Sequence, residues 1–490
     1  MFEVNIKFSN LLVTMYALTW LVFLLSAFFS PNTYGSGYVL LAFSLLGAVQ
    51  CFAILLSRSN MKGFILFCAL VNYVFIFLRV TFLSFFPESA KYFGTELEFD
   101  AIQIAETILF VTTFLLFFYM GLFFQNKIKI KGFNTQFLEH TAANNFLKLL
   151  AIGISPVIFN LYLYYISGSG RGGDVNKLEV LFSYFFHQDV FVLFTVALTS
   201  LIWSHLKDSY KLAFKLWCIF FIIAGIFVGS KGHIYTLILS LLFIKLAQGD
   251  FSIRISLKGV LLSVFMLGFG FSSFLIADAV RYAGQVFQGG ELPLFYLITL
   301  APDFVNFATP IDLLKGIARR MSHFEYIVLI INNTDASVFE LINFKSAIGW
   351  YFNFLMPGTP FPDAPIASLQ LMKVAYEGFP IDLVLQGKGT HGDYIPFPGL
   401  FLLLFGWVNA LIVVFLTGAV LGNLYSATLS SSSRYSYLLV LLFWICVNIL
   451  VNDSFGLDHF LQKSTIFVLT ACLFIVILRL LRLKFVFNKR

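Results

Sequence analysis

Charged side chains are scarce in this chain. Asp, Glu, Lys and Arg make up 12% of its 490 residues, whereas 59% are hydrophobic and the mean hydropathy is +0.88. A water-soluble domain does not have this composition. Phenylalanine alone supplies 63 residues, which is more than a water-exposed surface carries, whereas helix surfaces that face lipid accept it. The sequence therefore predicts a membrane protein.

The chain also lacks the motifs of several enzyme classes. It has no internal repeat, no glycine-rich phosphate loop and no dinucleotide fingerprint, so direct use of ATP is not expected. It has no HExxH or comparable spacing, so neither a metal nor another cofactor is predicted. The cysteines fall inside apolar runs without ligand spacing, which indicates core residues and no disulfide or zinc framework. They are Cys51, Cys68, Cys218, Cys446 and Cys472.

Apolar runs long enough to cross a membrane recur along the whole chain. A bilayer core of about 30 Å requires about 20 apolar residues per helix. About twelve runs approach that length, at residues 10–30, 38–57, 63–86, 101–125, 143–167, 178–203, 211–229, 233–248, 257–279, 398–421, 435–452 and 464–482. The predicted fold class is all-α: a polytopic membrane helix bundle of about twelve transmembrane helices with a large helical and irregular periplasmic loop.

The start of the chain and the seventh and eighth runs each allow a second interpretation. The first run, residues 10–30, starts too late and is too long for a cleavable signal peptide, so it is predicted to be a transmembrane span. The eighth is short, and with the seventh it would also fit a broken or re-entrant pair around residues 229–232. That alternative lowers the count to eleven or ten.

Basic residues in short loops indicate the orientation, because such loops stay in the cytoplasm during insertion. With twelve spans and the N-terminus inside, the inner segments contain Arg58, Lys62, Lys127, Lys129, Lys131, Lys207, Lys211, Lys215, Arg254, Lys258, Arg434, Arg479, Arg482, Lys484, Lys489 and Arg490. The short outer loops hold far fewer, and residues 87–100 are acidic. Both termini are therefore predicted to be cytoplasmic. This topology accounts for the net charge of +7, so nucleic acid is not a predicted partner.

The chain divides into three parts. Residues 1–279 form predicted transmembrane helices 1–9, residues 280–397 a large periplasmic loop, and residues 398–490 helices 10–12 with a cytoplasmic tail. In the loop, segment 293–320 is expected to form interfacial amphipathic helices, and segment 356–365, with four prolines, an extended strap. We therefore expect the loop to cover the outer end of the bundle as a cap.

Cations gather near the predicted outer membrane boundary, against the usual bias. They are Arg79, Arg171, Lys231, Arg281, Arg319 and Arg320. A lone cation buried in a membrane costs at least about 2.5 kcal/mol, so each requires an acidic side chain or an anionic ligand as its partner. Any one of these cations can have a purely structural role. That all of them have only structural roles is less expected.

Each cation also has a structural interpretation. Arg79 would pair with Glu106, which lies at a similar depth in the next span. Arg171 and Asp174 would cap a glycine-rich turn. The other four would reach the membrane surface or solvent from a helix end or a helix face: Lys231, Arg281, Arg319 and Arg320.

One candidate base follows two of these arginines in the sequence RRMSHFEY, which also contains Glu325. On a helix, Arg319 and His323 are four residues apart and share a face. A base beside a phosphate-binding arginine is a plausible active-site pattern. A solvated surface helix would have the same sequence.

A second candidate group lies in KGTHGDY, at the end of the large loop. It contains Lys388, His391 and Asp393, and a polar turn before a helix is the structural alternative. Weaker candidates lie in the sixth run and between the last two runs. They are His187, Gln188, Asp189, Asp453, Asp458 and His459.

These features together resemble the Wzy-type polymerases of O-antigen and polysaccharide repeat units. The shared features are about twelve spans, a GSKGH turn after a span, a large outer loop with an arginine-rich helix, and a following span, GLFLLLFGWVNALIVVFLTGAVLG. The resemblance covers essentially the whole chain. In some members of that family an arginine precedes a glycine by eleven positions, whereas here Phe182 and Leu292 lie eleven positions after Arg171 and Arg281.

The resemblance implies a metal-independent, GT-C-like membrane glycosyltransferase of the bacterial inner membrane. Its substrate would be oligosaccharide linked to undecaprenyl pyrophosphate, with membrane lipids and a chain-length regulator protein as further partners. Cations would stabilise the departing pyrophosphate, namely Arg171, Lys231, Arg281, Arg319 and Arg320, with Arg79, Glu325 and Lys388 as secondary candidates. The base would be His323, His391 or Asp393.

The sequence leaves three alternatives to a polymerase, and it does not separate the first of them, an O-antigen ligase, from a polymerase. An O-antigen ligase would share the fold, the donor and the cations, and would differ in its acceptor. A lipid-linked glycan flippase or another transporter would show two similar halves, which this chain lacks. A membrane acyltransferase would require a histidine-centred site for acyl donors, and no such motif is evident.

Overall fold

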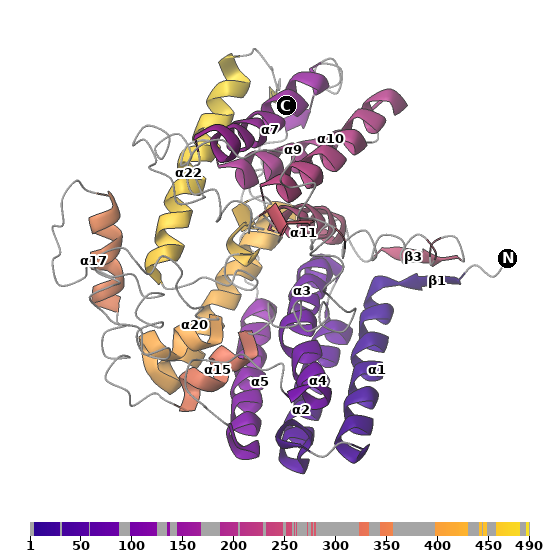
Figure 1. Ribbon diagram of the computed structural model, residues 1–490, viewed down its shortest axis with the longest axis vertical. Coiled ribbons are helices and arrows are strands. Elements are labelled where there is room, and N and C mark those ends of the chain that lie inside the picture. Colours follow the sequence, from indigo (N-terminus) through magenta and orange to yellow (C-terminus); the bar gives the residue numbers. More distant parts are fainter. Residues whose placement is uncertain are drawn as a thin grey trace.

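The structure is a computed structural model of the whole chain, and it is predominantly helical (Figure 1). It describes residues 4–29, 32–57, 59–87, 99–124, 135–137, 145–167, 187–203, 206–228, 232–247, 251–256, 323–332, 344–355, 397–429, 457–480 and 487–489, with isolated positions between 259 and 280 and between 441 and 447.

Seven helices in the described part of the chain are long and apolar enough to cross a membrane. They are Phe8–Phe29, Gly37–Leu56, Met61–Phe85, Ala101–Phe123, Phe146–Tyr165, Asp208–Phe227 and Phe397–Ser426. Each coincides with one of the predicted runs, which confirms the expectation of a polytopic helical membrane protein. Shorter apolar helices, Gln188–Ser200, Thr236–Ala247 and Ser464–Phe474, match the sixth, eighth and twelfth runs. The ninth and eleventh runs lie mostly outside the described residues.

One group of helices forms a close-packed bundle. It consists of α1 (Phe8–Phe29), α2 (Gly37–Leu56), α3 (Ser59–Asn72), α4 (Leu78–Phe85), α5 (Ala101–Phe123) and α20 (Phe397–Leu429). A π-helical turn, η2 (Tyr73–Phe77), joins α3 to α4. Local signals set the helix starts: Ser36 caps α2, and Asp100 forms a capping box with Gln103 at α5.

Glycines allow α5 and α20 to approach until their backbones touch. A Cβ atom on Gly121 would lie 2.1 Å from the carbonyl oxygen of Phe415, and one on Gly418 would lie 2.3 Å from that of Phe118. Small residues at such contacts are typical of helices that associate in membranes, where close packing replaces the hydrophobic effect.

A second group consists of α7 (Phe146–Tyr162), α9 (Gln188–Ile202), α10 (Asp208–Phe227) and α11 (Gly232–Ala247). In Figure 1, α7, α9 and α10 lie beside one another, with α22 (Leu457–Leu480) next to them. Here a Cβ atom on Gly153 would meet the side chain of Thr195 and not a backbone atom. The indole N–H of Trp217 donates to the carbonyl oxygen of Leu150, 3.1 Å away.

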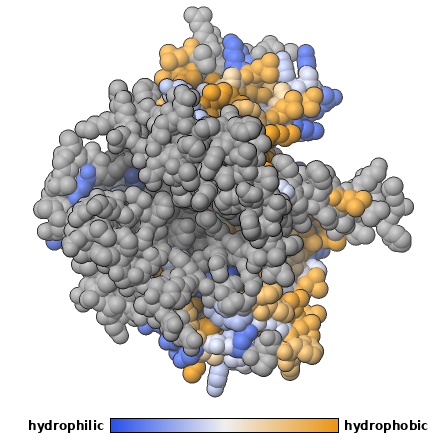
Figure 2. All heavy atoms as spheres, in the orientation of Figure 1, coloured by the Kyte–Doolittle hydropathy of each residue, from blue (hydrophilic) through white to orange (hydrophobic). Residues whose placement is uncertain are grey.

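The outside of both groups is apolar. Figure 2 shows orange, hydrophobic atoms over α1 and α10 on the part of the surface that the structure describes. Exposed side chains there include Leu18, Leu21 and Leu25 of α1 and Leu212, Leu216 and Ile219 of α10. An apolar exterior of this extent requires lipid as its solvent.

The tenth predicted run is not one straight helix, because α20 breaks at Gly406, which has φ 71° and ψ 176°. A positive φ of this kind favours glycine. Phe397, at the start of α20, packs on Phe114 of α5, with ring centroids 5.2 Å apart, whereas Trp407 packs on Phe110. The chain then returns along α5, since the carbonyl of Phe415 lies at Gly121.

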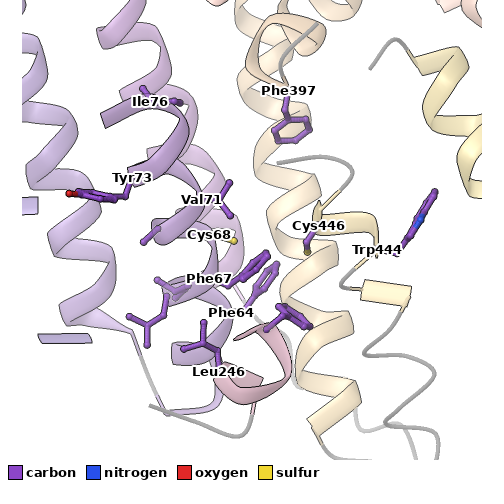
Figure 3. Close-up of a cluster of buried hydrophobic side chains, with 14 of the residues drawn as sticks. Phe64, Phe67, Cys68, Val71, Tyr73, Ile76, Leu246, Phe397, Trp444 and Cys446 are labelled. Atoms are coloured by element: carbon purple, nitrogen blue, oxygen red, sulfur yellow. The ribbon is translucent and has the colours of Figure 1, made fainter. Parts of the chain in front are cut away.

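The spacing of these contacts requires a fold-back. Phe397 and Phe415 would lie about 27 Å apart on a straight helix, whereas their partners Phe114 and Gly121 are only about 10 Å apart along α5. The first segment of α20 therefore runs toward the N-terminal end of α5, and the second runs back. Figure 3 shows the consequence, because Phe397 lies among the buried side chains near the level of Ile76.

Part of the predicted cap also lies inside the bundle. The helix α15 (His323–Asn332) belongs to the loop 280–397, yet its residues from Phe324 to Ile330 are at most 1% exposed. It packs against η2, α5 and α20. Segments 293–320 and 356–365, expected to form surface helices and a strap, lie outside the described residues. A further helix of the loop, α17 (Phe344–Leu355), packs against α22.

Four short strands depart from the all-α expectation. β1 (Val4–Lys7) pairs antiparallel with β3 (Ser252–Ile255), and β2 (Thr135–Phe137) pairs antiparallel with β4 (Phe487–Lys489). The pairs join segments far apart in the sequence, so the sequence pattern gave no sign of them. They tie the N-terminal strand to the chain after α11, and the chain after α5 to the C-terminal segment.

Candidate functional site

A buried ion pair joins the bundle to the large loop. Arg79 of α4 is 0% exposed and Glu325 of α15 is 1% exposed. The Nε atom of Arg79 donates to both carboxylate oxygens of Glu325, at 3.1 and 3.2 Å, and its Nη2 atom donates to Oε1. Several charge-assisted hydrogen bonds therefore fix the orientation of both side chains.

The pair is deep within the protein. Arg79 lies six residues, or about 9 Å, before the end of the span Met61–Phe85. It follows the π-helical turn η2 closely, and such turns are frequent at functional sites. Removing one partner of a buried ion pair typically costs about 3–5 kcal/mol, because the other charge is left uncompensated.

The predicted partner of Arg79 was wrong. Glu106 is exposed on α5, whereas Glu325, 246 residues away in the sequence, holds the guanidinium. Arg79 does have an acidic partner, as the rule for buried charges predicts. The choice of Glu106 was wrong because closeness in the sequence does not reveal a contact between elements that are distant in the sequence. Arg79 and Glu325, both secondary site candidates, thus contact each other.

The turn between α1 and α2 closes over the same end of the bundle. Asn32 Nδ2 and Ser26 Oγ both donate to the carbonyl oxygen of Ser84, at 2.7 and 2.9 Å. Tyr34 is 7% exposed in this turn. Burial raises its pKa well above the usual value, the nearby charge of Glu325 adds to the rise, and Arg79 opposes it. Tyr34 therefore remains a neutral hydroxyl at physiological pH.

Two adjacent tyrosines connect the end of their own helix to the ends of two other predicted runs. Tyr164 and Tyr165 belong to a second π-helical turn, η4 (Leu163–Ser167), which follows α7. The Tyr164 hydroxyl donates to the carbonyl oxygen of Val280, 3.2 Å away, and the Tyr165 hydroxyl donates to that of Phe227, 2.7 Å away. The ends of the fifth, seventh and ninth predicted runs therefore lie together.

These three ends lead into three of the predicted phosphate-binding cations. Arg281 follows Val280 directly, Lys231 follows Phe227 by four residues, and Arg171 follows Tyr165 by six. The cations themselves lie outside the described residues. The structure brings together the residues that precede these cations in the sequence.

Most of the other predicted site residues also lie outside the described part of the chain. They are Arg319, Arg320, Lys388, His391 and Asp393. His323 is the first residue of α15, with only its backbone described. Of the weaker candidates, Asp453 is not described, and Asp458 and His459 lie in the first turn of α22.

The weaker candidates of the sixth run form a small polar group at the start of α9. His187 Nδ1 lies 4.0 Å from a carboxylate oxygen of Asp189, and both side chains are more than a third exposed. Asn160 Nδ2 of α7 donates to Gln188 Oε1, 2.9 Å away. The bond from Asn160 joins α7 to α9 and gives Gln188 a structural role, whereas His187 and Asp189 contact each other within the start of α9.

Sequence reasoning missed a set of neutral polar groups inside the bundle. The Tyr119 hydroxyl donates to Gln50 Oε1 at 2.6 Å, and the Tyr16 hydroxyl donates to the carbonyl oxygen of Ala69 at 2.7 Å. Thr19 and Tyr73 share a further hydrogen bond of 2.6 Å. Single tyrosines and glutamines within apolar runs were the available signal, and the partners became visible only in the packed structure.

Among the described residues, no group of three or more His, Cys, Asp or Glu side chains is arranged to hold a metal ion. Comparison of the chain with known protein families, with characterised proteins and with solved structures gives no match.

Proposed function

We propose that this protein is a membrane glycosyltransferase that polymerises lipid-linked polysaccharide repeat units. It transfers the growing glycan from undecaprenyl pyrophosphate to a repeat unit on a second undecaprenyl pyrophosphate, at the periplasmic face of the bacterial inner membrane. The observation that carries this proposal is the meeting of Tyr164 and Tyr165 with Val280 and Phe227. That contact supports a shared anion site for the cations that follow, because a diphosphate requires several donors converging from different segments.

The long-range contacts support the topology on which the proposal rests. Eight of the predicted runs separate β1 from β3, and eight separate β2 from β4. An even number keeps each pair on one face of the membrane, which agrees with cytoplasmic termini and with about twelve spans. If α10 and α11 form a re-entrant pair, the count falls to ten and remains even. Eleven spans would separate the strands.

The contacts at the other end of the bundle support the same orientation. Arg79, Ser84, Tyr165 and Val280 all lie at or near the ends of odd-numbered runs, which the charge bias puts outside. Asn32 in the α1–α2 turn and Glu325 in α15, which contact Ser84 and Arg79, belong to predicted outer segments as well.

The chemistry requires a base and an anion site. The acceptor hydroxyl oxygen attacks the anomeric carbon of the donor glycan, the bond from that carbon to the pyrophosphate oxygen breaks, and the hydroxyl proton passes to the base. Candidate bases are His323, His391 and Asp393. Undecaprenyl pyrophosphate leaves with the bonding electron pair, and fixed cations stabilise the charge that develops: Arg171, Lys231, Arg281, Arg319 and Arg320. No metal is needed for this step.

The test is polymerisation by the purified, full-length protein in detergent or nanodiscs. Undecaprenyl-pyrophosphate-linked oligosaccharide should be converted into a ladder of longer glycans with release of undecaprenyl pyrophosphate. Arg281→Ala and Arg319→Ala should each lower kcat by about 10²–10³, the usual effect of removing one donor to a developing charge. Lys211→Ala, which removes a positive charge from the first turn of α10, should retain activity.

Deletion of the gene in its host separates the alternatives. A single repeat unit on surface glycan supports a polymerase, whereas loss of all attached glycan favours an O-antigen ligase. Accumulation of lipid-linked glycan on the cytoplasmic face would indicate a transporter. Wild-type glycan lengths with both arginine variants would refute the anion site.

A further inference from the structure

The helix α15 has little in its own composition to define its rotation. Every residue from Phe324 to Ile330 is buried, and apart from Glu325 and Tyr326 all of them are purely apolar. A surface helix is oriented by the contrast between its apolar and polar faces. Here apolar side chains point in all directions, so apolar packing alone does not select one rotation about the helix axis.

Glu325 supplies the missing constraint. It is the only carboxylate in α15, and it has to face α4 because Arg79 binds it there. Any other rotation of α15 would bury two uncompensated charges in an apolar interior. A buried polar pair that specifies one arrangement among several apolar ones is known from helical assemblies, where it sets register.

The far end of α15 is braced by a different contact. The side chain of Ile330 lies against Gly399 in the first segment of α20, where a Cβ atom would be 2.6 Å from Ile330 Cδ1. That segment is held in turn by the packing of Phe397 and Phe401 on Phe114 of α5. The ion pair and the fold-back at Gly406 thus hold α15 from two sides.

The orientation of α15 matters because of what precedes it. His323 is its first residue, and Arg319 and Arg320 lie four and three positions before His323, respectively. We infer that Arg79 and Glu325 are positioning residues: their ion pair sets the rotation of α15 and thereby the placement of the candidate base His323, the first residue of that helix. This inference rests on the proposed glycosyl transfer. Neither side chain is required to touch the substrate.

Two paired variants test this role without leaving a lone charge. Arg79→Met with Glu325→Leu keeps the site filled and apolar, and such replacements are often neutral for stability. Arg79→Glu with Glu325→Arg restores an ion pair with the charges exchanged. The matched control is Tyr119→Phe with Gln50→Leu, which removes another buried hydrogen bond from the same bundle.

The apolar pair should purify as a folded protein, with kcat lowered about tenfold or more and KM changed less than about threefold, because a misdirected catalytic segment affects turnover more than ground-state binding. The exchanged pair should recover a substantial part of the lost kcat. The control should keep wild-type values of both constants. Wild-type kcat in the apolar pair, or no recovery in the exchanged pair, would overturn the inference.

A second readout does not depend on activity. Ile330→Cys with Gly399→Cys, introduced after replacement of the five native cysteines, should form a disulfide under mild oxidation, because Ile330 Cγ1 and Cγ2 lie 3.7 Å from the Cβ position at Gly399. Cross-linking should slow about tenfold when the apolar pair is added, since no polar contact then selects the rotation of α15 that brings residues 330 and 399 together. Unchanged cross-linking would also contradict the inference. If cross-linking responds but no form of the protein transfers glycan, the proposed function fails and the orienting role of the ion pair stands.

Discussion

The two helix groups are held together by different kinds of contact. In the α1–α5 group with α15 and α20, the anchor is a fully buried ion pair and the glycines bring backbone against backbone. In the α7–α11 group, the anchors are single neutral donors on backbone carbonyls, namely the hydroxyls of Tyr164 and Tyr165 and the indole N–H of Trp217, and Gly153 meets only a side chain. The first kind is costly to break and does not adjust, whereas the second is weaker and more tolerant. The comparison predicts a rigid scaffold beside a more adaptable region.

The charged anchor should give the largest effect. Glu325→Ala leaves Arg79 buried without its carboxylate, so the free energy of unfolding should fall by about 3–5 kcal/mol. Thermal unfolding of the purified protein in detergent, followed by size-exclusion chromatography, measures the change. Glu106→Ala, which removes an exposed carboxylate from α5, should alter stability by no more than about 0.5 kcal/mol. Equal melting temperatures of Glu325→Ala and Glu106→Ala would show that the buried ion pair is not a strong anchor of the first helix group.

Substitution of a glycine should also cost more stability in the first helix group, at Gly121, than in the second, at Gly153. Gly121→Ala forces a Cβ atom against the carbonyl oxygen of Phe415, so α5 and α20 must separate, at a cost of about 1–3 kcal/mol. Gly153→Ala meets the side chain of Thr195, which can shift further than a backbone can, so its cost should be smaller. Gly37→Ala has open space around it and serves as the control. A larger loss of thermal stability for Gly153→Ala would reverse the comparison.

The neutral anchors should contribute least to stability and more to activity. Tyr165→Phe removes only the hydroxyl that binds the carbonyl oxygen of Phe227, so unfolding should become easier by about 0.5–1.5 kcal/mol. If the three helix ends frame the anion site, KM for the lipid-linked substrate should rise as well. Tyr162→Phe, at an exposed tyrosine of α7, is the matched control. Unchanged KM in Tyr165→Phe would separate this contact from the proposed site.

Tyr34 gives a pH-dependent test of the rigid group. Burial raises its pKa, with a further rise from Glu325 and an opposing effect of Arg79, so the folded protein favours the neutral phenol. The resulting stability is fully present below the unfolded pKa of about 10 and is lost as pH rises above it. The melting temperature of wild type minus that of Tyr34→Phe should therefore be constant from neutral pH to about 10 and should fall beyond. A difference that changes near neutral pH would contradict this assignment.

Several features of the fold and the site could be predicted from the sequence. Apolar runs predicted the membrane class and the positions of the seven long helices, because a spanning helix is encoded by about 20 contiguous residues. The rule for buried charges marked Arg79 as a residue that needs a partner. The same local patterns predicted one straight helix for the tenth run, since a lone glycine among apolar residues reveals neither a positive φ nor a reversal of direction.

Local sequence patterns therefore specify the solvent of the chain, the approximate helices and the residue types that require partners. Tertiary structure alone decided that Glu325 meets Arg79 across 246 residues, that α20 folds back at Gly406, and that Tyr164 and Tyr165 gather the ends of separate helices. The physical reason is that hydropathy acts over neighbouring residues, whereas ion pairing and close packing depend on which distant surfaces fit together in the folded chain.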